Sequence, residues 1–167
     1  CSPWNPDYRR EWGVVELDED GGLTGYRNNY CSSILARDAD SGDLIWAYNL
    51  TPQDQWDLDE PNANILVDLE IDGRLRKALV RPARNGFFYV LDRITGEFLL
   101  GKPFTDTTWA REIGPDGRPI ILNDGSQGCL PEPWGGTNFM PPSFNPALGM
   151  MFVTARESCA TFVPQEP

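Results

Sequence analysis

Residues 87–100 read FFYVLDRITGEFLL, and this stretch decides the fold class of the chain. Two apolar runs flank the turn pattern Asp-x-x-Thr-Gly, in which Asp92 and Thr95 can cap the turn and Gly96 can supply a positive φ. Such a pattern is typical of a β-hairpin. We therefore predict two antiparallel strands joined at residues 92–96.

The same pattern occurs earlier, where residues 31–46 read CSSILARDADSGDLIW. The aspartates of the two copies are 54 positions apart, somewhat longer than the ~40–50 residues of common propeller repeats. Between the copies, residues 64–69 and 76–81 are predicted strands around Asp72-Gly73, a strong tight-turn signal. A last strand pair is expected at residues 150–155 and their neighbours, after a stretch rich in Pro and Gly.

The strand pattern predicts an all-β fold. No segment shows helical periodicity over ten or more residues. Many short strands with repeated turn signals indicate a sandwich, a barrel or a propeller, and the long-period repeat favours the propeller. We expect four-stranded antiparallel sheets around residues 34–47, 65–80 and 87–100, and no helix of three turns within residues 30–105.

Composition narrows the possible partners. The chain has 167 residues, 40% of them hydrophobic, which is enough for one modest core or a part of a larger domain. Its formal net charge is -11, which disfavours nucleic acid and anionic membrane surfaces. No apolar run approaches the length of a membrane span. No signal peptide is present, but because the chain does not begin with Met this says nothing about the full-length product.

The chain has no histidine, which excludes Ser-His-Asp catalysis and His-containing zinc sites from these residues. The four cysteines (Cys1, Cys31, Cys129 and Cys159) show no Cys-x-x-Cys spacing. One or two disulfides in an oxidising compartment are therefore favoured over zinc or thioredoxin-like chemistry.

The most chemically suggestive stretch is residues 51–59, TPQDQWDLD, with three aspartates within six positions. In an extended chain Asp57 and Asp59 leave the same face roughly 6.6 Å apart. Two such carboxylates repel by about 2.5 kcal/mol at an effective dielectric of ~20. A cation bound between them would make the electrostatic energy of the arrangement favourable. The alternative is a solvated acidic turn, which is common in loops.

This stretch resembles the pattern Thr-Pro-His-Asp-x-Trp-Asp of methanol/ethanol-type quinoprotein dehydrogenases, which use pyrroloquinoline quinone (PQQ); Gln53 stands where His is usual. The resemblance implies that Asp57 is the catalytic carboxylate and a metal ligand. Asp59 matches the extra carboxylate of lanthanide-dependent members, whereas calcium-dependent members usually carry a small residue there.

Further motifs carry the same resemblance. Arg84-Asn85-Gly86 matches a turn whose Arg reaches the quinone carbonyl oxygens, and residues 135–144, GGTNFMPPSF, resemble a Gly-Gly-x-Asn-Trp segment whose Asn (Asn138) hydrogen-bonds PQQ. Read as structure alone, the first is a turn and the second a Gly-rich loop with a turn Asn. Cys129 and Cys159 fall where the family has a disulfide. Cys1 and Cys31 could form a second bridge, without motif support.

The resemblance also extends to architecture. In residues 36–46 the string Ala-x-Asp-x-x-Ser-Gly-x-x-x-Trp is similar to the family's tryptophan docking motif, in which the Trp of one blade stacks on the next. Residues 2–6, SPWNP, resemble a segment preceded by a metal-ligating Asn. We interpret residues 1–167 as a fragment of one eight-bladed propeller domain, two to three blades long, with a surface-loop insertion at residues 11–29. The family's vicinal cysteines, stacking Trp and other metal ligands would lie upstream.

The resemblance implies oxidation of primary alcohols to aldehydes by base-assisted hydride transfer to PQQ beside a lanthanide(III) or Ca2+ ion. Electrons would pass to a cytochrome c in the periplasm. The resemblance is also compatible with a homodimer. Two other readings stay open: a non-catalytic propeller scaffold with quinoprotein-like repeats, and a PQQ dehydrogenase acting on sugars or polyols. Asp57, Arg84 and Asn138 should converge on one pocket if the enzyme reading is correct.

Overall fold

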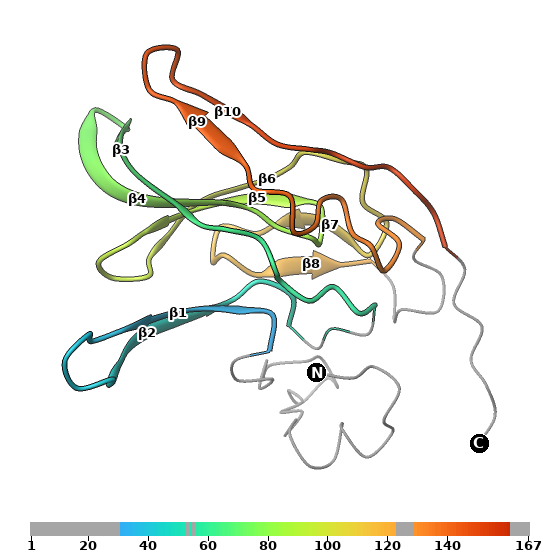
Figure 1. The fold of residues 1–167 in the computed structure, drawn as a ribbon. Helices are drawn as coiled ribbons and strands as arrows, with labels where there is room; N and C mark the ends of the chain where they lie inside the picture. Colours follow the sequence, from blue (N-terminus) through green and yellow to red (C-terminus); the bar gives the residue numbers. More distant parts are fainter. Residues whose placement is uncertain (1–30, 53, 55, 123–128, 161–167) are drawn as a thin grey trace. The chain divides into compact units, whose positions relative to one another are not determined.

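The computed structural model describes residues 31–52, 54, 56–122 and 129–160 (Figure 1). These residues form strands, turns and loops, and the described part contains no helix. No helix long and apolar enough to cross a membrane occurs among them. The chain divides into two compact units, Cys1–Asp59 and Glu60–Pro167. The predicted insertion at residues 11–29 and the possible Cys1–Cys31 bridge involve residues outside the described part.

In the first unit, strands β1 (Ser33–Arg37) and β2 (Leu44–Asn49) form an antiparallel hairpin. The carboxylate of Asp38 accepts the backbone N–H groups of Asp40 at 3.0 Å and Ser41 at 2.8 Å. These hydrogen bonds, the one from Ser41 foremost, lower the pKa of Asp38. The hairpin is therefore the predicted one, but the described residues give it two strands rather than the four we expected around residues 34–47.

The second unit contains one four-stranded antiparallel sheet in the order β3-β4-β5-β6 (Figure 1). Its strands are β3 (Ile65–Ile71), β4 (Arg74–Pro82), β5 (Phe87–Asp92) and β6 (Phe98–Pro103). The separate sheets expected around residues 65–80 and 87–100 were wrong: both hairpins belong to this sheet, because a short turn lets β5 pair with the free edge of β4.

Local turn chemistry explains both hairpins of this sheet. Asp72 and Gly73, with φ of 52° and 73°, form the two-residue connection between β3 and β4, as expected for a twisted hairpin. Between β5 and β6, the carboxylate of Asp92 accepts the N–H groups of Ile94 at 2.9 Å and Thr95 at 3.1 Å. Both turns confirm the predictions made from the sequence.

Two small strand pairs complete the second unit: β7 (Ala110–Ile113) with β8 (Pro119–Ile121), and β9 (Ser143–Asn145) with β10 (Met150–Phe152). The second pair confirms the strands expected near residues 150–155. The sheet core is built on Ala78, Val80 and Val90, with partly buried neighbours that include Met151 of β10.

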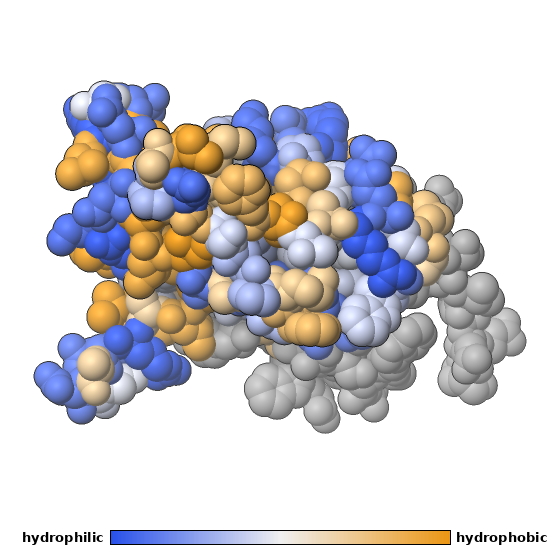
Figure 2. All heavy atoms as spheres, turned by 45° about the horizontal axis from the view of Figure 1, so that its top comes forward, coloured by the Kyte–Doolittle hydropathy of each residue, from blue (hydrophilic) through white to orange (hydrophobic). Residues whose placement is uncertain are grey.

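Large apolar side chains stay exposed in this unit, among them Leu66 and Leu75 at 63% and 75%. Figure 2 shows apolar side chains interspersed with hydrophilic ones on the face that it presents.

Candidate functional site

Asp57 occupies a strained backbone position in the first unit. Its φ is 61°, in the left-handed region that residues other than Gly rarely adopt. Its two neighbours, Trp56 and Leu58, are buried at 2% and 0% exposure, whereas Asp57 is partly exposed and Asp59 is exposed. The two carboxylates therefore lie at the accessible positions of this segment. Because Asp57 is left-handed, the 6.6 Å separation expected for an extended chain does not apply.

A buried carboxylate supports that backbone. Asp54, 5% exposed, accepts the backbone N–H of Trp56 at 2.9 Å and also that of Leu58. The hydroxyl of Ser32 lies 3.5 Å from the other oxygen of Asp54. Burial raises the pKa of Asp54 to about 6, and the charges of Asp59 and Asp57 act in the same direction. The two N–H groups that Asp54 holds flank Asp57, so Asp54 stabilises the strained segment on both sides.

Arg84, in the second unit, belongs to the turn between β4 and β5. The N–H of Gly86 donates to the carbonyl of Ala83 at 3.1 Å, and Gly86 has a φ of 90°. Asn85 is fully buried: its amide nitrogen donates to the Tyr89 hydroxyl at 3.0 Å and its amide oxygen accepts the N–H of Phe87 at 3.1 Å. The predicted turn is confirmed, and Asn85 is the side chain that locks it.

The loop that carries Asn138 packs directly on this turn. The N–H of Gly136 donates to the carbonyl of Arg84 at 2.8 Å, and the guanidinium of Arg84 donates to the carbonyl of Pro133. A Cβ on Gly135 would lie 2.0 Å from Cγ of Arg84 and 2.5 Å from its carbonyl oxygen. The Gly-Gly pair is thus required for the close approach of the two motifs, which the structure brings together.

The amide of Asn138 is engaged locally. Its nitrogen donates to the carbonyl of Trp134 at 2.8 Å, and its oxygen accepts the N–H of Phe139 at 2.8 Å. An amide nitrogen has a second donor and an amide oxygen a second lone pair. Asn138 can therefore bind a ligand while these local bonds hold its side chain in place.

A disulfide joins Cys129 to Cys159, as predicted. Near the bridge, the N–H of Ala160 donates to the carbonyl of Cys129 at 3.1 Å, and the N–H of Glu132 donates to the carbonyl of Ser158 at 3.0 Å. These links hold the chain immediately before the Gly-Gly pair against residues 156–160, and so support the Asn138 loop.

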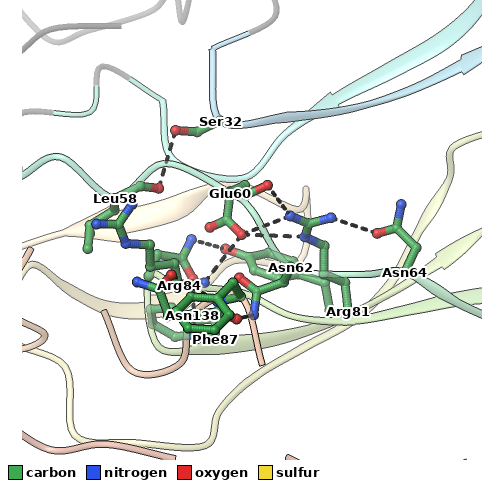
Figure 3. Close-up of polar contacts among 12 residues, drawn as sticks. Ser32, Leu58, Glu60, Asn62, Asn64, Arg81, Arg84, Phe87 and Asn138 are labelled. Carbon is green, nitrogen blue, oxygen red and sulfur yellow. Dashed lines mark hydrogen bonds and ion pairs between the residues drawn. The ribbon is translucent and has the colours of Figure 1, made fainter. Parts of the chain in front are cut away.

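No sequence motif pointed to three residues that lie beside this site: Glu60, Asn62 and Arg81 (Figure 3). The Asn62 amide nitrogen donates to the backbone carbonyl of Asn138, and the Glu60 carboxylate accepts the backbone N–H of Arg84 at 3.3 Å. The only local signal was Arg81 itself, a charged residue at the end of the apolar run 78–80.

The donor set around Asn138 and Arg84 suits a polar ligand. Within the described part of the chain, the Thr137 hydroxyl is buried without a hydrogen-bond partner. A buried hydroxyl in that state is uncommon, and a ligand oxygen would supply the missing acceptor. A quinone with carbonyl and carboxylate oxygens fits the Thr137 hydroxyl, the Arg84 guanidinium and the Asn138 amide. No group of three or more His, Cys, Asp or Glu side chains that could hold a metal ion occurs in the described ranges.

Residues 13–103 match the PQQ family of glucose/ethanol/alcohol dehydrogenase β-propeller domains. The chain belongs to this family. The resemblance and the propeller fold predicted from the sequence are thereby confirmed, and the β3–β6 sheet has the four antiparallel strands of a propeller blade.

Curated relatives of this PQQ-family chain are alcohol dehydrogenases. The quinohemoprotein alcohol dehydrogenase of Comamonas testosteroni is 40% identical over 79% of this chain and 19% of its own length. The lanthanide-dependent methanol dehydrogenase of Methylacidiphilum fumariolicum (strain SolV) is 36% identical over 83% of this chain and 24% of its own length. The chain therefore spans about a fifth to a quarter of these relatives.

Solved structures similar to this chain are also alcohol or methanol dehydrogenases. A europium-containing methanol dehydrogenase superimposes with a TM-score of 0.75 at 37% identity, over 78% of this chain and 24% of that one. A quinohemoprotein alcohol dehydrogenase (ADHIIG) from Pseudomonas putida HK5 covers 99% of this chain with a TM-score of 0.78 at 33% identity. At these identities the likeness supports both the fold and the family.

Proposed function

We propose that the full-length protein is a PQQ- and metal-dependent dehydrogenase that oxidises primary alcohols to aldehydes. The observation that carries this proposal is the direct packing of the Arg84 turn on the Asn138 loop, with the Gly136 N–H bonded to the Arg84 carbonyl. The two loops are held at contact distance, and each carries a side chain suited to a quinone oxygen.

The residues of this chain would have separate tasks. Asp57 is the general base that takes the proton from the substrate hydroxyl, and its strained backbone is supported by Asp54. The Arg84 guanidinium and the Asn138 amide would hold the quinone through hydrogen bonds, and Arg84 would place a positive charge beside it. When bound, PQQ supplies the acceptor for the hydride and the metal ion a Lewis acid.

Asp57 and Asp59 belong to the first unit, and Arg84 and Asn138 to the second. The fragment's place in one eight-bladed domain and the docking role of Trp46 are part of this proposal. Both carboxylates would contribute to the metal shell, with a lanthanide(III) ion preferred over Ca2+. Electrons would leave through a cytochrome c in the periplasm, and the enzyme would form a homodimer.

The experiment is the Asp57→Asn variant of the full-length enzyme. It keeps the shape of the side chain and removes the base, so turnover of a primary alcohol should fall by at least about 100-fold while PQQ stays bound in normal amounts. Retention of most of the activity would make Asp57 a structural turn residue.

A sugar or polyol substrate is the second candidate, because the matched family itself includes glucose dehydrogenases. Comparison of kcat/KM for methanol, ethanol, glycerol and glucose in the wild-type enzyme separates the two candidates.

A further inference from the structure

A buried ion pair lies beside the predicted quinone-binding residues (Figure 3). The side chains of Glu60 and Arg81 are only 3% and 5% exposed. Oε2 of Glu60 lies 3.2 Å from Nη2 and 3.4 Å from Nε of Arg81, so one carboxylate oxygen contacts two nitrogens of the guanidinium.

Arg81 also holds the chain segment that follows Glu60. Its Nη2 donates to the Glu60 backbone carbonyl at 2.7 Å, and its Nη1 donates to Oδ1 of Asn64 at 2.8 Å. One guanidinium on β4 therefore fixes both ends of residues 60–64, which we name the strap. With its charge and most of its donors used inside the protein, Arg81 is not available to a ligand.

The strap reaches both quinone-binding loops. Oε2 of Glu60 accepts the backbone N–H of Arg84 at 3.3 Å. Two positions further on, the Asn62 amide nitrogen donates to the backbone carbonyl of Asn138. The Arg84 carbonyl in turn accepts the N–H of Gly136. The strap and this last bond close a ring of contacts around Arg84 and Asn138.

A buried ion pair is weak evidence for a role in stability. Removing two charges from water costs several kcal/mol for each ion, and replacement of a buried pair by apolar residues is often neutral or stabilising. In some proteins such pairs instead enforce a single geometry, and the contacts of Arg81 with both ends of the strap favour that role here. The charge balance also matters: Arg81 neutralises Glu60, so that the strap adds no net negative charge beside a cofactor that itself bears carboxylates.

We propose that Glu60, Arg81 and Asn62 are positioning residues, which hold Arg84 and Asn138 at a fixed separation for PQQ. None of the three needs to touch the cofactor. This inference rests on the proposed function, since it takes Arg84 and Asn138 as the residues that bind PQQ.

The test uses the full-length apoenzyme and PQQ titrated by fluorescence quenching, with the thermal midpoint measured in parallel. Glu60→Gln removes the charge that holds Arg81 and weakens the acceptor for Arg84, and Asn62→Ala removes the donor to Asn138. Each variant should raise the Kd for PQQ about 10-fold or more, the usual size of effect for residues that orient a site. The KM for the alcohol should stay near the wild-type value, because substrate contacts are unchanged.

The matched control is Glu97→Gln, which removes an ion-pair partner of Arg76 on the same strand β4, at a largely exposed carboxylate. Its Kd for PQQ should equal that of wild type. If Glu60→Gln and Asn62→Ala lower the thermal midpoint but bind PQQ as tightly as wild type, the strap is structural and the inference fails.

Failure of the assumption that this inference takes from the proposed function, PQQ binding at Arg84 and Asn138, has a different signature, because wild type itself would then bind no PQQ. Should Glu60→Gln not accumulate as folded protein, Asn62→Ala decides alone. It changes no charge and leaves one carbonyl to be satisfied by water.

Discussion

The indole N–H of Trp109 donates a hydrogen bond to the backbone carbonyl of Asn85 at 2.8 Å. Trp109 is 1% exposed, and its ring stands edge-on to that of Phe87 at 88°, with 5.9 Å between the ring centroids. Trp109, just before β7, therefore supports the turn that presents Arg84, although Trp109 and Asn85 are 24 positions apart.

Trp109→Phe should destabilise the full-length protein by about 2–3 kcal/mol, because it removes the hydrogen bond to Asn85 and leaves part of the ring volume empty. The midpoint of urea unfolding measures the change. Trp134→Phe is the control, since that side chain is 55% exposed, and its effect should stay within about 0.5 kcal/mol. Equal shifts in the two variants would contradict the support we assign to Trp109.

Gly135→Ala should impair PQQ binding, whereas Gly149→Ala should not. Both glycines have a positive φ, of 80° and 62°, so both substitutions carry backbone strain of about 1–2 kcal/mol. Only at Gly135 would the new Cβ collide with Arg84; nothing lies within 4 Å at Gly149. Thermal midpoints report the backbone strain that both variants share, and PQQ titrations report the collision that only Gly135→Ala introduces. Equal Kd values for PQQ in the two variants would show that the loops can move apart.

Asp54 should make the stability of the metal-free protein depend on pH. Its pKa is raised from 3.8 to about 6 on folding, so the folded state binds the proton more tightly than the unfolded state. The resulting stabilisation is complete below pH ~4 and is lost as the pH rises through ~6. Relative to Asp54→Asn, wild type should lose about 3 kcal/mol of unfolding free energy across this range. Denaturant unfolding of both proteins from pH 4 to 7 measures this loss. If the unfolding free energies of wild type and Asp54→Asn changed equally with pH, the raised pKa of Asp54 would be refuted.

Asp59→Ala should shift the metal preference of the full-length enzyme from lanthanide toward calcium. Asp59 adds one formal negative charge, from which a trivalent ion gains more Coulomb energy than a divalent ion of similar radius. Reconstitution of the metal-free enzyme with La3+ or Ca2+, followed by activity and metal titrations, measures the preference. Equal activity of the wild-type enzyme with either ion would instead place Asp59 in solvent beside an ordinary calcium site.

The sequence by itself determined the hairpins. Each is closed by a few consecutive residues, such as Asp72-Gly73 or the cap that Asp92 makes to Ile94 and Thr95, and these contacts depend only on neighbours along the chain. The Arg84 turn was visible for the same reason. The disulfide and the site residues came from resemblance to a family, whose motifs summarise contacts that spacing alone does not reveal.

The tertiary structure decided how these pieces combine. A turn specifies its own two strands but not the partner of their outer edges, which is why two predicted hairpins proved to share one sheet. Likewise, Glu60 reaches Arg84 across 24 positions and Asn62 reaches Asn138 across 76. No local pattern encodes such pairs, because their hydrogen bonds form only after packing has brought distant backbone together and excluded water from it.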